Sequence, residues 1–197
     1  MVKFRPPKEN MSTNYDEREL LPLLFPSSGH PSRTVKCPIT TEDHHVGKKL
    51  SALLAERYAD GELPPEKVLV HFIGSAGDYF GDGLVSGITF VVDSVGRHGC
   101  ARMHGGVVVI LSEPGANFCE EFSCGCVYVY DVHGKLLQPS MSALLSAEHL
   151  LPTSAEAQLL KSLVTQHAEL TGSRKAKRIL SDWAAALPLF VRVTASL

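Results

Sequence analysis

Four of the five cysteines lie in the middle of the chain, where they could in principle hold a metal ion. Cys124 and Cys126 are one residue apart in a stretch typical of a strand, so their side chains point the same way, roughly 7 Å apart. Zinc and iron–sulfur sites usually have two residues between such cysteines. Cys100 and Cys119 stand at equivalent places of a repeat. We therefore predict buried thiols, with no metal and no cofactor, because a free cysteine packs as a small apolar residue.

Two glycine-rich segments could bind phosphate groups. They are Gly74-Ser-Ala-Gly77 and Gly81-Asp-Gly83, the latter followed by Gly87. A dinucleotide-binding loop follows a strand and opens a helix. These glycines lead instead into residues that are typical of a strand, and we predict no phosphate site.

The remaining polar residues form no recognisable catalytic set. The nine histidines fall mostly in turns, and no serine or cysteine has the setting of a nucleophile. The basic cluster at 174–178 lacks aromatic neighbours, and the formal net charge is −2, so we predict a solvated helix face and no nucleic-acid binding.

No apolar run approaches the roughly 20 residues of a membrane span, so no membrane association is predicted. Five cysteines without a secretory signal predict an intracellular protein, cytoplasmic rather than organellar.

The glycines repeat with one period. Two series run at intervals of 19 residues, ten residues out of phase. The first is Gly77, Gly96, Gly115 and Gly134, and the second is Gly87, Gly106 and Gly125. A fixed period near 20 residues is typical of a solenoid, whose units bury their apolar faces against one another. We expect these glycines at corners that need a positive φ or a close backbone approach.

Each repeat ends in a β-branched or aromatic run that predicts a strand. The sequence thus predicts a mainly β fold, a right-handed parallel β-helix of three to four turns with flanking α-helices. Val91, Ile110 and Val129 are expected to stack inside it. The opposite face carries residues with polar tips, namely His71, Tyr128 and Tyr130. We expect that face to lie under helices or against a partner.

Four segments follow from this pattern. They are a mobile N-terminal arm (1–36), an entry helix and linker (37–67), the β-helix (68–138) and a C-terminal helical segment (139–197). In the arm, the apolar segment 20–25 predicts a docking peptide or a flap on its own chain. The entry helix is expected over 40–61, capped by Thr40 or Thr41.

The C-terminal segment predicts two helices. Thr153 and Glu156 match a capping box, and Gly172 is expected to end the first helix. Ser173 is expected to cap the second helix, which Pro188 stops.

Several segments closely resemble the C-terminal β-helix domain of the glutamate synthase large subunit, its GXGXG domain. They are GRHGCARMHGGVVVIL, GANFCEEFSCGCVYVYD and LVTQHAELTGSRKAKRILSDWAAALPLFVRV, with ITTEDHHVGKKLSALLAERY and GSAG before them. The resemblance covers about residues 37–197, and the closing helical segment is its most specific part. A similar domain occurs in a subunit of formylmethanofuran dehydrogenase, but the C-terminal helices favour the glutamate synthase branch.

The resemblance implies a non-catalytic brace, since in that family the domain lies between the glutaminase and synthase domains. The nucleophilic cysteine, FMN barrel and iron–sulfur cysteines of the parent enzyme have no counterpart here, so no catalytic residue is carried over. The family domain has more turns, as though the middle ones were removed here. We expect a structural subunit of a split glutamate synthase or of a repurposed scaffold, bound to a protein partner or a copy of itself. The alternative is a small-ligand-binding protein or oxidoreductase subunit with a site at the glycine corners.

Overall fold

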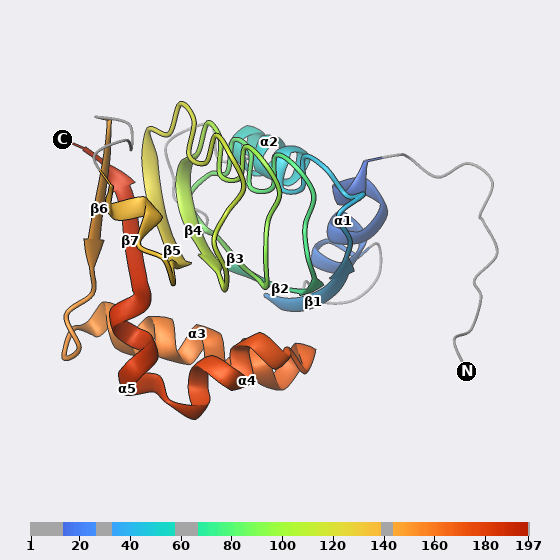
Figure 1. Ribbon diagram of the computed structural model, residues 1–197. Helices are drawn as coiled ribbons and strands as arrows, with labels where there is room; N and C mark the ends of the chain where they lie inside the picture. The colour runs from blue at the N-terminus through green and yellow to red at the C-terminus, as the bar shows by residue number, and fades with distance from the viewer. Residues whose placement is uncertain (1–13, 27–32, 58–66, 139–143, 197) are drawn as a thin grey trace.

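The computed structural model describes residues 14–26, 33–57, 67–138 and 144–196. Its strands form one seven-stranded sheet in the order β1-β2-β3-β4-β5-β7-β6 (Figure 1). Five neighbouring strands are parallel: β1 (Thr34–Ile39), β2 (Val68–Gly74), β3 (Ile88–Val92), β4 (His104–Ile110) and β5 (Cys124–Tyr130). The strand β7 (Phe190–Ala195) pairs antiparallel with both β5 and β6 (Leu145–His149).

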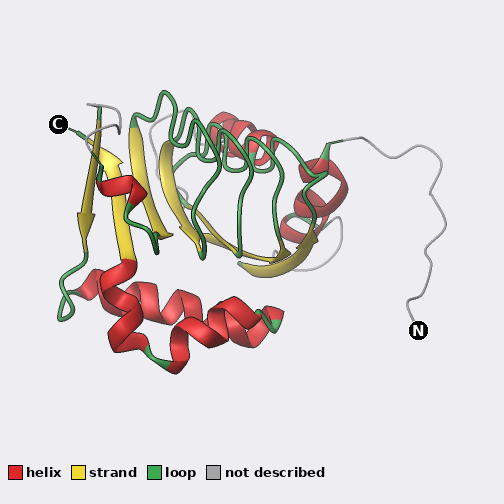
Figure 2. Ribbon diagram, viewed as in Figure 1, coloured by secondary structure: helices red, strands yellow, loops and turns green. Residues whose placement is uncertain are grey.

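The predicted β-helix is wrong: the fold is a mixed α/β arrangement around one open, mostly parallel sheet. The sheet does not close on itself, and β1 and β6 are its edges. The segments that connect β2, β3, β4 and β5 contain turns and no strand of a second sheet (Figure 2). The physical reason is that alternate residues in these connections have positive φ, as at Tyr79, His98 and Asn117. Such residues cannot continue an extended strand.

Helices cover both sides of the sheet (Figure 2). One side packs against α3 (Ala155–Thr171), α4 (Arg174–Ser181), α5 (Trp183–Ala186) and a 3₁₀ turn, η3 (Leu187–Leu189). The other side faces the connecting loops, α2 (Lys48–Arg57), α1 (Leu21–Leu24) and η1 (Asp16–Leu20). A further 3₁₀ turn, η2 (Lys135–Leu137), follows β5. The sheet therefore lies between two apolar cores.

The register differs from the predicted stacking at β3. Val70 pairs with Phe90 and Phe90 with Val108, at separations of 20 and 18 residues. Val91 lies beside Val109 and faces the C-terminal helices, so it does not stack with Ile110 and Val129 as predicted. A cluster of aromatic rings accounts for the shift, because Phe90 packs against Phe72 with ring centroids 5.0 Å apart.

Part of the predicted mobile arm is packed against the domain. Residues 14–26 form η1 and α1, and Leu20 and Leu24 are fully buried. The apolar segment 20–25 therefore contacts its own chain, while residues 1–13 and 27–32 lie outside the described residues. The Tyr15 hydroxyl donates to the Pro38 carbonyl at 2.7 Å, which ties η1 to β1.

The helix ends match the expectations in part. α2 begins at Lys48, later than predicted, and Gly61, its predicted end, lies outside the described residues. Ser154, and not Thr153, caps α3, which ends at the left-handed Gly172 as predicted. Ser173 caps α4, as the sequence indicated.

Candidate functional site

Three connecting loops lie against one another in layers. We call residues 77–83, 96–102 and 115–121 the first, second and third loops. The Gly96 N–H donates to Gly77 O at 3.1 Å, and the Gly115 N–H donates to Gly96 O at 3.2 Å. Positive φ recurs at the same three places of each loop, with nine residues in all: Tyr79, Gly81, Gly83, His98, Cys100, Arg102, Asn117, Cys119 and Glu121. The period of 19 residues is therefore the period of this loop stack.

The first glycine series marks where the loops touch. A Cβ added to Gly96 would lie 2.8 Å from Gly77 C, and one added to Gly115 would lie 2.5 Å from Gly96 O. At Gly77 it would lie 2.5 Å from the Thr41 carbonyl oxygen. Gly134 differs, because no atom lies within 4 Å of its added Cβ. The stack of described loops thus ends at the third loop.

The second glycine series lies at the entries to β3, β4 and β5. Gly87, Gly106 and Gly125 have φ of 90°, 78° and 112°, in the left-handed region that favours glycine. A Cβ on Gly106 would also lie 2.8 Å from the Val85 and Ile88 carbonyl oxygens. Backbone atoms fill the space next to Gly106, but Gly87 and Gly106 also line a cavity of about 530 Å³ between the sheet and α3.

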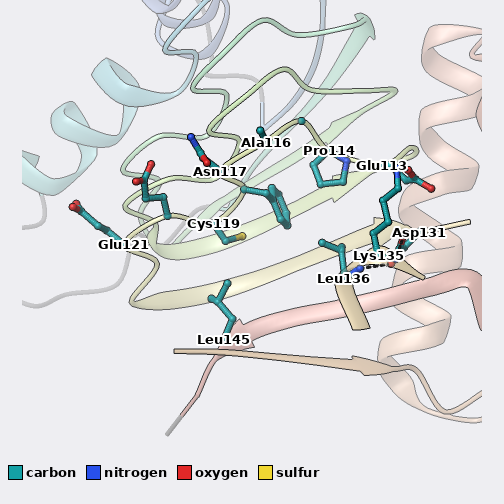
Figure 3. A pocket seen from close by; sticks show the side chains of 13 residues that line it. Glu113, Pro114, Ala116, Asn117, Cys119, Glu121, Asp131, Lys135, Leu136 and Leu145 are labelled. Atoms are coloured by element: carbon teal, nitrogen blue, oxygen red, sulfur yellow. Dashed lines mark hydrogen bonds and ion pairs between the residues drawn. The ribbon is translucent and has the colours of Figure 1, made fainter. Parts of the chain in front are cut away.

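A slot of about 620 Å³ lies against the outer side of the third loop (Figure 3). One wall is residues 113–121, and the other includes Asp131, Lys135, Leu136 and Leu145. Four carboxylates and one lysine line the slot: Glu113, Glu120, Glu121, Asp131 and Lys135. The Lys135 ammonium contacts Glu113 at 2.5 Å and lowers the pKa of that carboxyl. Asp131 accepts from the Leu136 N–H at 2.8 Å and holds η2 in place.

A buried polar network joins the sheet to the C-terminal helices. His71 Nδ1 and His167 Nδ1 are 3.3 Å apart, and His167 Nε2 is 3.2 Å from Asp93. The Ser173 hydroxyl donates to Asp93 at 2.5 Å. Burial and the neighbouring His167 lower the pKa of His71 to about 4. Burial alone would raise the pKa of Asp93, but its bonds to His167 and Ser173 bring that pKa below the usual value.

This network has residue types found in hydrolases, but its two histidines are shielded from solvent. His71 and His167 are fully buried. The Ser173 hydroxyl also accepts from the Ala176 N–H at 3.1 Å as the α4 cap. It therefore ties α3 and α4 to the sheet.

The face predicted to meet helices or a partner is covered by helices. His71 is fully buried, and Tyr128 is 3% exposed and packs in the core beneath the C-terminal helices. Tyr130 is half-buried, with its ring centroid 5.0 Å from that of Phe190. His71 and Tyr128 are thus covered by the chain itself.

The cysteines do not gather into one cluster. Cys100 and Cys119 are buried on adjacent loops, as predicted, and burial together with the Cys100 thiol raises the pKa of Cys119. Cys126 is half-buried, whereas Cys124 is exposed, contrary to the prediction of buried thiols. Within the described ranges, no three His, Cys, Asp or Glu residues are placed to hold a metal ion.

Sequence reasoning missed two polar features beside the loops. Asp82 is fully buried and accepts from Arg102 Nε and a terminal guanidinium nitrogen at 3.0 and 2.7 Å. Burial would raise the pKa of Asp82, but the Arg102 guanidinium lowers it below its usual value. The Tyr79 ring is stacked between His45 and His98, with centroids 4.6 and 4.5 Å away. The 19-residue spacing of Tyr79 and His98 was the signal available in the sequence.

A second cavity, of about 390 Å³, opens where β4 and β5 end beside α4. Leu111, Val132 and Ile179 contribute apolar surface. Polar and charged side chains also line it: Ser112, Glu113, Tyr130, His133, Lys175 and Arg178. Ligands commonly bind beyond the carboxyl ends of parallel strands.

None of the described helices is both long and apolar enough to cross a membrane.

Comparison with known proteins relates this loop stack to glutamate synthases. The NADH glutamate synthase of Schizosaccharomyces pombe is 28% identical over 238 aligned positions, covering 84% of this chain and 11% of the relative. The large chain of the NADPH enzyme of Bacillus subtilis is 33% identical over 108 residues, covering 55% of this chain and 7% of the relative. The ferredoxin-dependent enzyme of Pyropia yezoensis is 36% identical over 103 residues, covering 52% and 7%.

The chain therefore spans about a tenth or less of the length of these relatives. The alignment with the S. pombe enzyme has 238 positions, more than the 197 residues of this chain, so that relative has additional residues inside the matched region. The family model described as the GXGXG motif matches residues 84–196, from the end of the first loop through β7. The chain belongs to the GXGXG family and carries a domain of glutamate synthase type.

Proposed function

We propose that this chain is a non-catalytic structural subunit of a glutamate-synthase-type assembly, in which glutaminase and synthase functions reside on other polypeptides. The observation that carries the proposal is the extent of the family match. Residues 84–196 include two stacked loops, β4, β5 and the helices that pack on them. The matched part is thus one packed unit, as a brace requires.

The use of the polar residues supports a structural role. In the His71–His167–Asp93–Ser173 network, the two histidines are fully buried between the sheet and the C-terminal helices. A Cβ at Gly106 or Gly125 would meet neighbouring backbone, which gives these two glycines a structural role. The alternative, a ligand site at the glycine corners, would use the cavity of about 530 Å³ that Gly87 and Gly106 line.

Native purification tests the proposal. The tagged chain, expressed at its normal level in its own cells, should co-elute in fixed ratio with glutaminase-type and synthase-type polypeptides. Glutamate synthase activity should be present in the assembly and absent from the recombinant chain. Recovery of the chain alone, or activity of the chain by itself, would contradict the proposal.

A second candidate function is the binding of a small organic anion in the cavity at the ends of β4 and β5. The observation that favours it is the pairing of apolar residues with Lys175 and Arg178 in one cavity. Anilinonaphthalene sulfonate, an apolar anion, should bind the wild-type chain, and Arg178→Gln should weaken that binding. Lys177→Gln is the matched control, since Lys177 is exposed on the same helix and does not line the cavity. Equal effects of the two substitutions would exclude this site.

A further inference from the structure

The loops of the stack are joined through a fixed set of main-chain groups. Four groups of the first loop bond to the second: Gly77 O, Tyr79 N–H, Phe80 O and Gly83 N–H. The equivalent groups of the second loop bond to the third: Gly96 O, His98 N–H, Gly99 O and Arg102 N–H. These eight bonds measure between 2.7 and 3.2 Å. Each loop therefore presents the same order of acceptor, donor, acceptor and donor to the next.

The third loop presents this order to the slot. By the same period its outward groups are Gly115 O, Asn117 N–H, Phe118 O and Glu121 N–H, and all four residues line the slot. Among the described residues, no hydrogen bond joins these four groups to another part of the chain. Main-chain groups usually bond to other main chain or to water, so this end of the stack is open to a further layer.

The third loop, like the second, has no glycine at its three left-handed positions. Its left-handed residues are Asn117, Cys119 and Glu121, whereas two of the three in the first loop are glycines, Gly81 and Gly83. Left-handed conformations are unfavourable for residues other than glycine and persist where neighbours hold them. The second loop has a neighbouring loop on both sides, whereas the third has one on one side only.

The opposite end of the stack is already closed by the chain itself. Gly77 N–H donates to Asp43 O at 3.1 Å, and Gly81 N–H donates to Val46 O at 2.8 Å. Asp78 O accepts from the His45 N–H at 3.1 Å. A second copy of the chain therefore cannot extend the stack by placing its first loop on the third loop.

We propose that the slot is the docking site for a main-chain segment of a different protein, which adds a fourth layer to the stack. The residue of that segment that faces Gly115 O is a glycine, because a Cβ at Gly96 or Gly115 would strike the loop before it. Its flanking side chains are basic, because the slot is lined by four carboxylates and one lysine. Two copies that met slot to slot would bring these carboxylates together, which disfavours a homodimer.

This inference rests on the proposed structural role, and hydrogen–deuterium exchange distinguishes the two. Exchange is measured at single-residue resolution in the recombinant chain and in the natively purified assembly. The Asn117 and Glu121 amides should exchange rapidly in the chain alone and at least ten-fold more slowly in the assembly. The His98 and Arg102 amides, already bonded to the third loop, serve as internal controls and should be slow in both.

Each outcome has one meaning. An assembly in which Asn117 and Glu121 stay unprotected overturns the docking site and leaves the structural role intact. Absence of any assembly overturns both. Protection of these amides in the chain alone, rising with its concentration, identifies a second copy as the occupant and also overturns the proposal.

A matched pair of substitutions gives an independent test. Ala116→Trp adds bulk at an exposed residue that lines the slot. Arg97→Trp adds the same ring at the equivalent exposed position of the second loop, which lies outside the slot. With thermal unfolding as a check that both variants fold, Ala116→Trp should reduce partner recovery at least ten-fold and Arg97→Trp should not. Equal recovery with both variants would overturn the proposal.

Discussion

Removal of the Asp16 carboxylate should strongly destabilise the chain. Asp16 is fully buried, and its two carboxylate oxygens accept from the Gly47 and Lys49 N–H groups at 2.8 Å and from the Leu50 N–H at 3.0 Å. These donors lie at the start of α2, where backbone N–H groups lack partners within the helix. A side chain 31 residues earlier in the chain thus performs the work of a helix cap.

The size of the effect follows from these three bonds. Hydrogen bonds to a charged group contribute about 1.5–3 kcal/mol each, and loss of a helix cap alone costs about 0.5–2 kcal/mol. Because the three bonds share one carboxylate and are not additive, we expect Asp16→Ala to lower the free energy of unfolding by about 3 kcal/mol. Asp16→Asn keeps one acceptor oxygen and should cost roughly half as much.

Urea unfolding followed by circular dichroism measures both variants through the shift in midpoint. Glu19→Ala is the control, because Glu19 is a half-buried acid on the same helical turn, and its ion pair with Arg18 is long, at 3.4 Å. We expect the control to change stability by less than about 0.5 kcal/mol. If Asp16→Ala matched this control, the capping role would be refuted.

Three further predictions concern other parts of the chain. The pKa of His71 is about 4 when folded and near 6.5 when unfolded, so the unfolded state binds more protons between these values. The contribution of His71 to the free energy of unfolding is therefore fully present above pH 7, and that free energy should fall by up to about 3 kcal/mol as the pH drops to 4. Urea denaturation at a series of pH values measures this dependence, and His71→Gln should make it weaker. Gly96→Ala should lower the melting temperature more than Gly134→Ala, because a Cβ at Gly96 would strike another loop, whereas at Gly134 the cost is the strain of a left-handed φ of 65° alone. Arg102→Met should destabilise the chain by about 1–3 kcal/mol, because the buried Asp82 carboxylate loses two hydrogen bonds. In urea titrations, adding Asp82→Asn to this variant should recover part of the lost stability. If the effects of the two substitutions were additive, the two residues would be uncoupled.

The sequence indicated the four strands β2 to β5 because each is a compact β-branched or aromatic run. It did not reveal the register at β3. Paired residues of β2 and β3 are 20 residues apart and those of β3 and β4 are 18 apart, and these two separations average to the 19-residue period of the glycines. The strand β1 was hidden by its polar surroundings and by Pro38, which an edge strand tolerates. The strands β6 and β7 were included in a helical segment, although the alternation in Phe190–Ala195 was a usable signal.

The candidate site could be predicted only in part. The 19-residue glycine period correctly predicted that Gly77, Gly96 and Gly115 lie at close backbone contacts. It also extended the series to Gly134, which lies outside the stack, and so concealed the open end at the third loop. The residue type gave a weak signal at Asn117, because Asn adopts the left-handed conformation more readily than most residues, and gave none at Glu121.

The layering of the loops also gives the chain an order of assembly during synthesis. Residues 43–46, which close the first loop, leave the ribosome before it, and each later loop bonds to the one made 19 residues earlier. Contacts between segments so close in sequence form quickly, and domains generally fold from the N-terminus as they emerge. The antiparallel strand β7 joins β5 only after the C-terminal helices have been made. Each loop thus provides the main-chain groups to which the next loop bonds, and the corresponding groups of the third loop face outward.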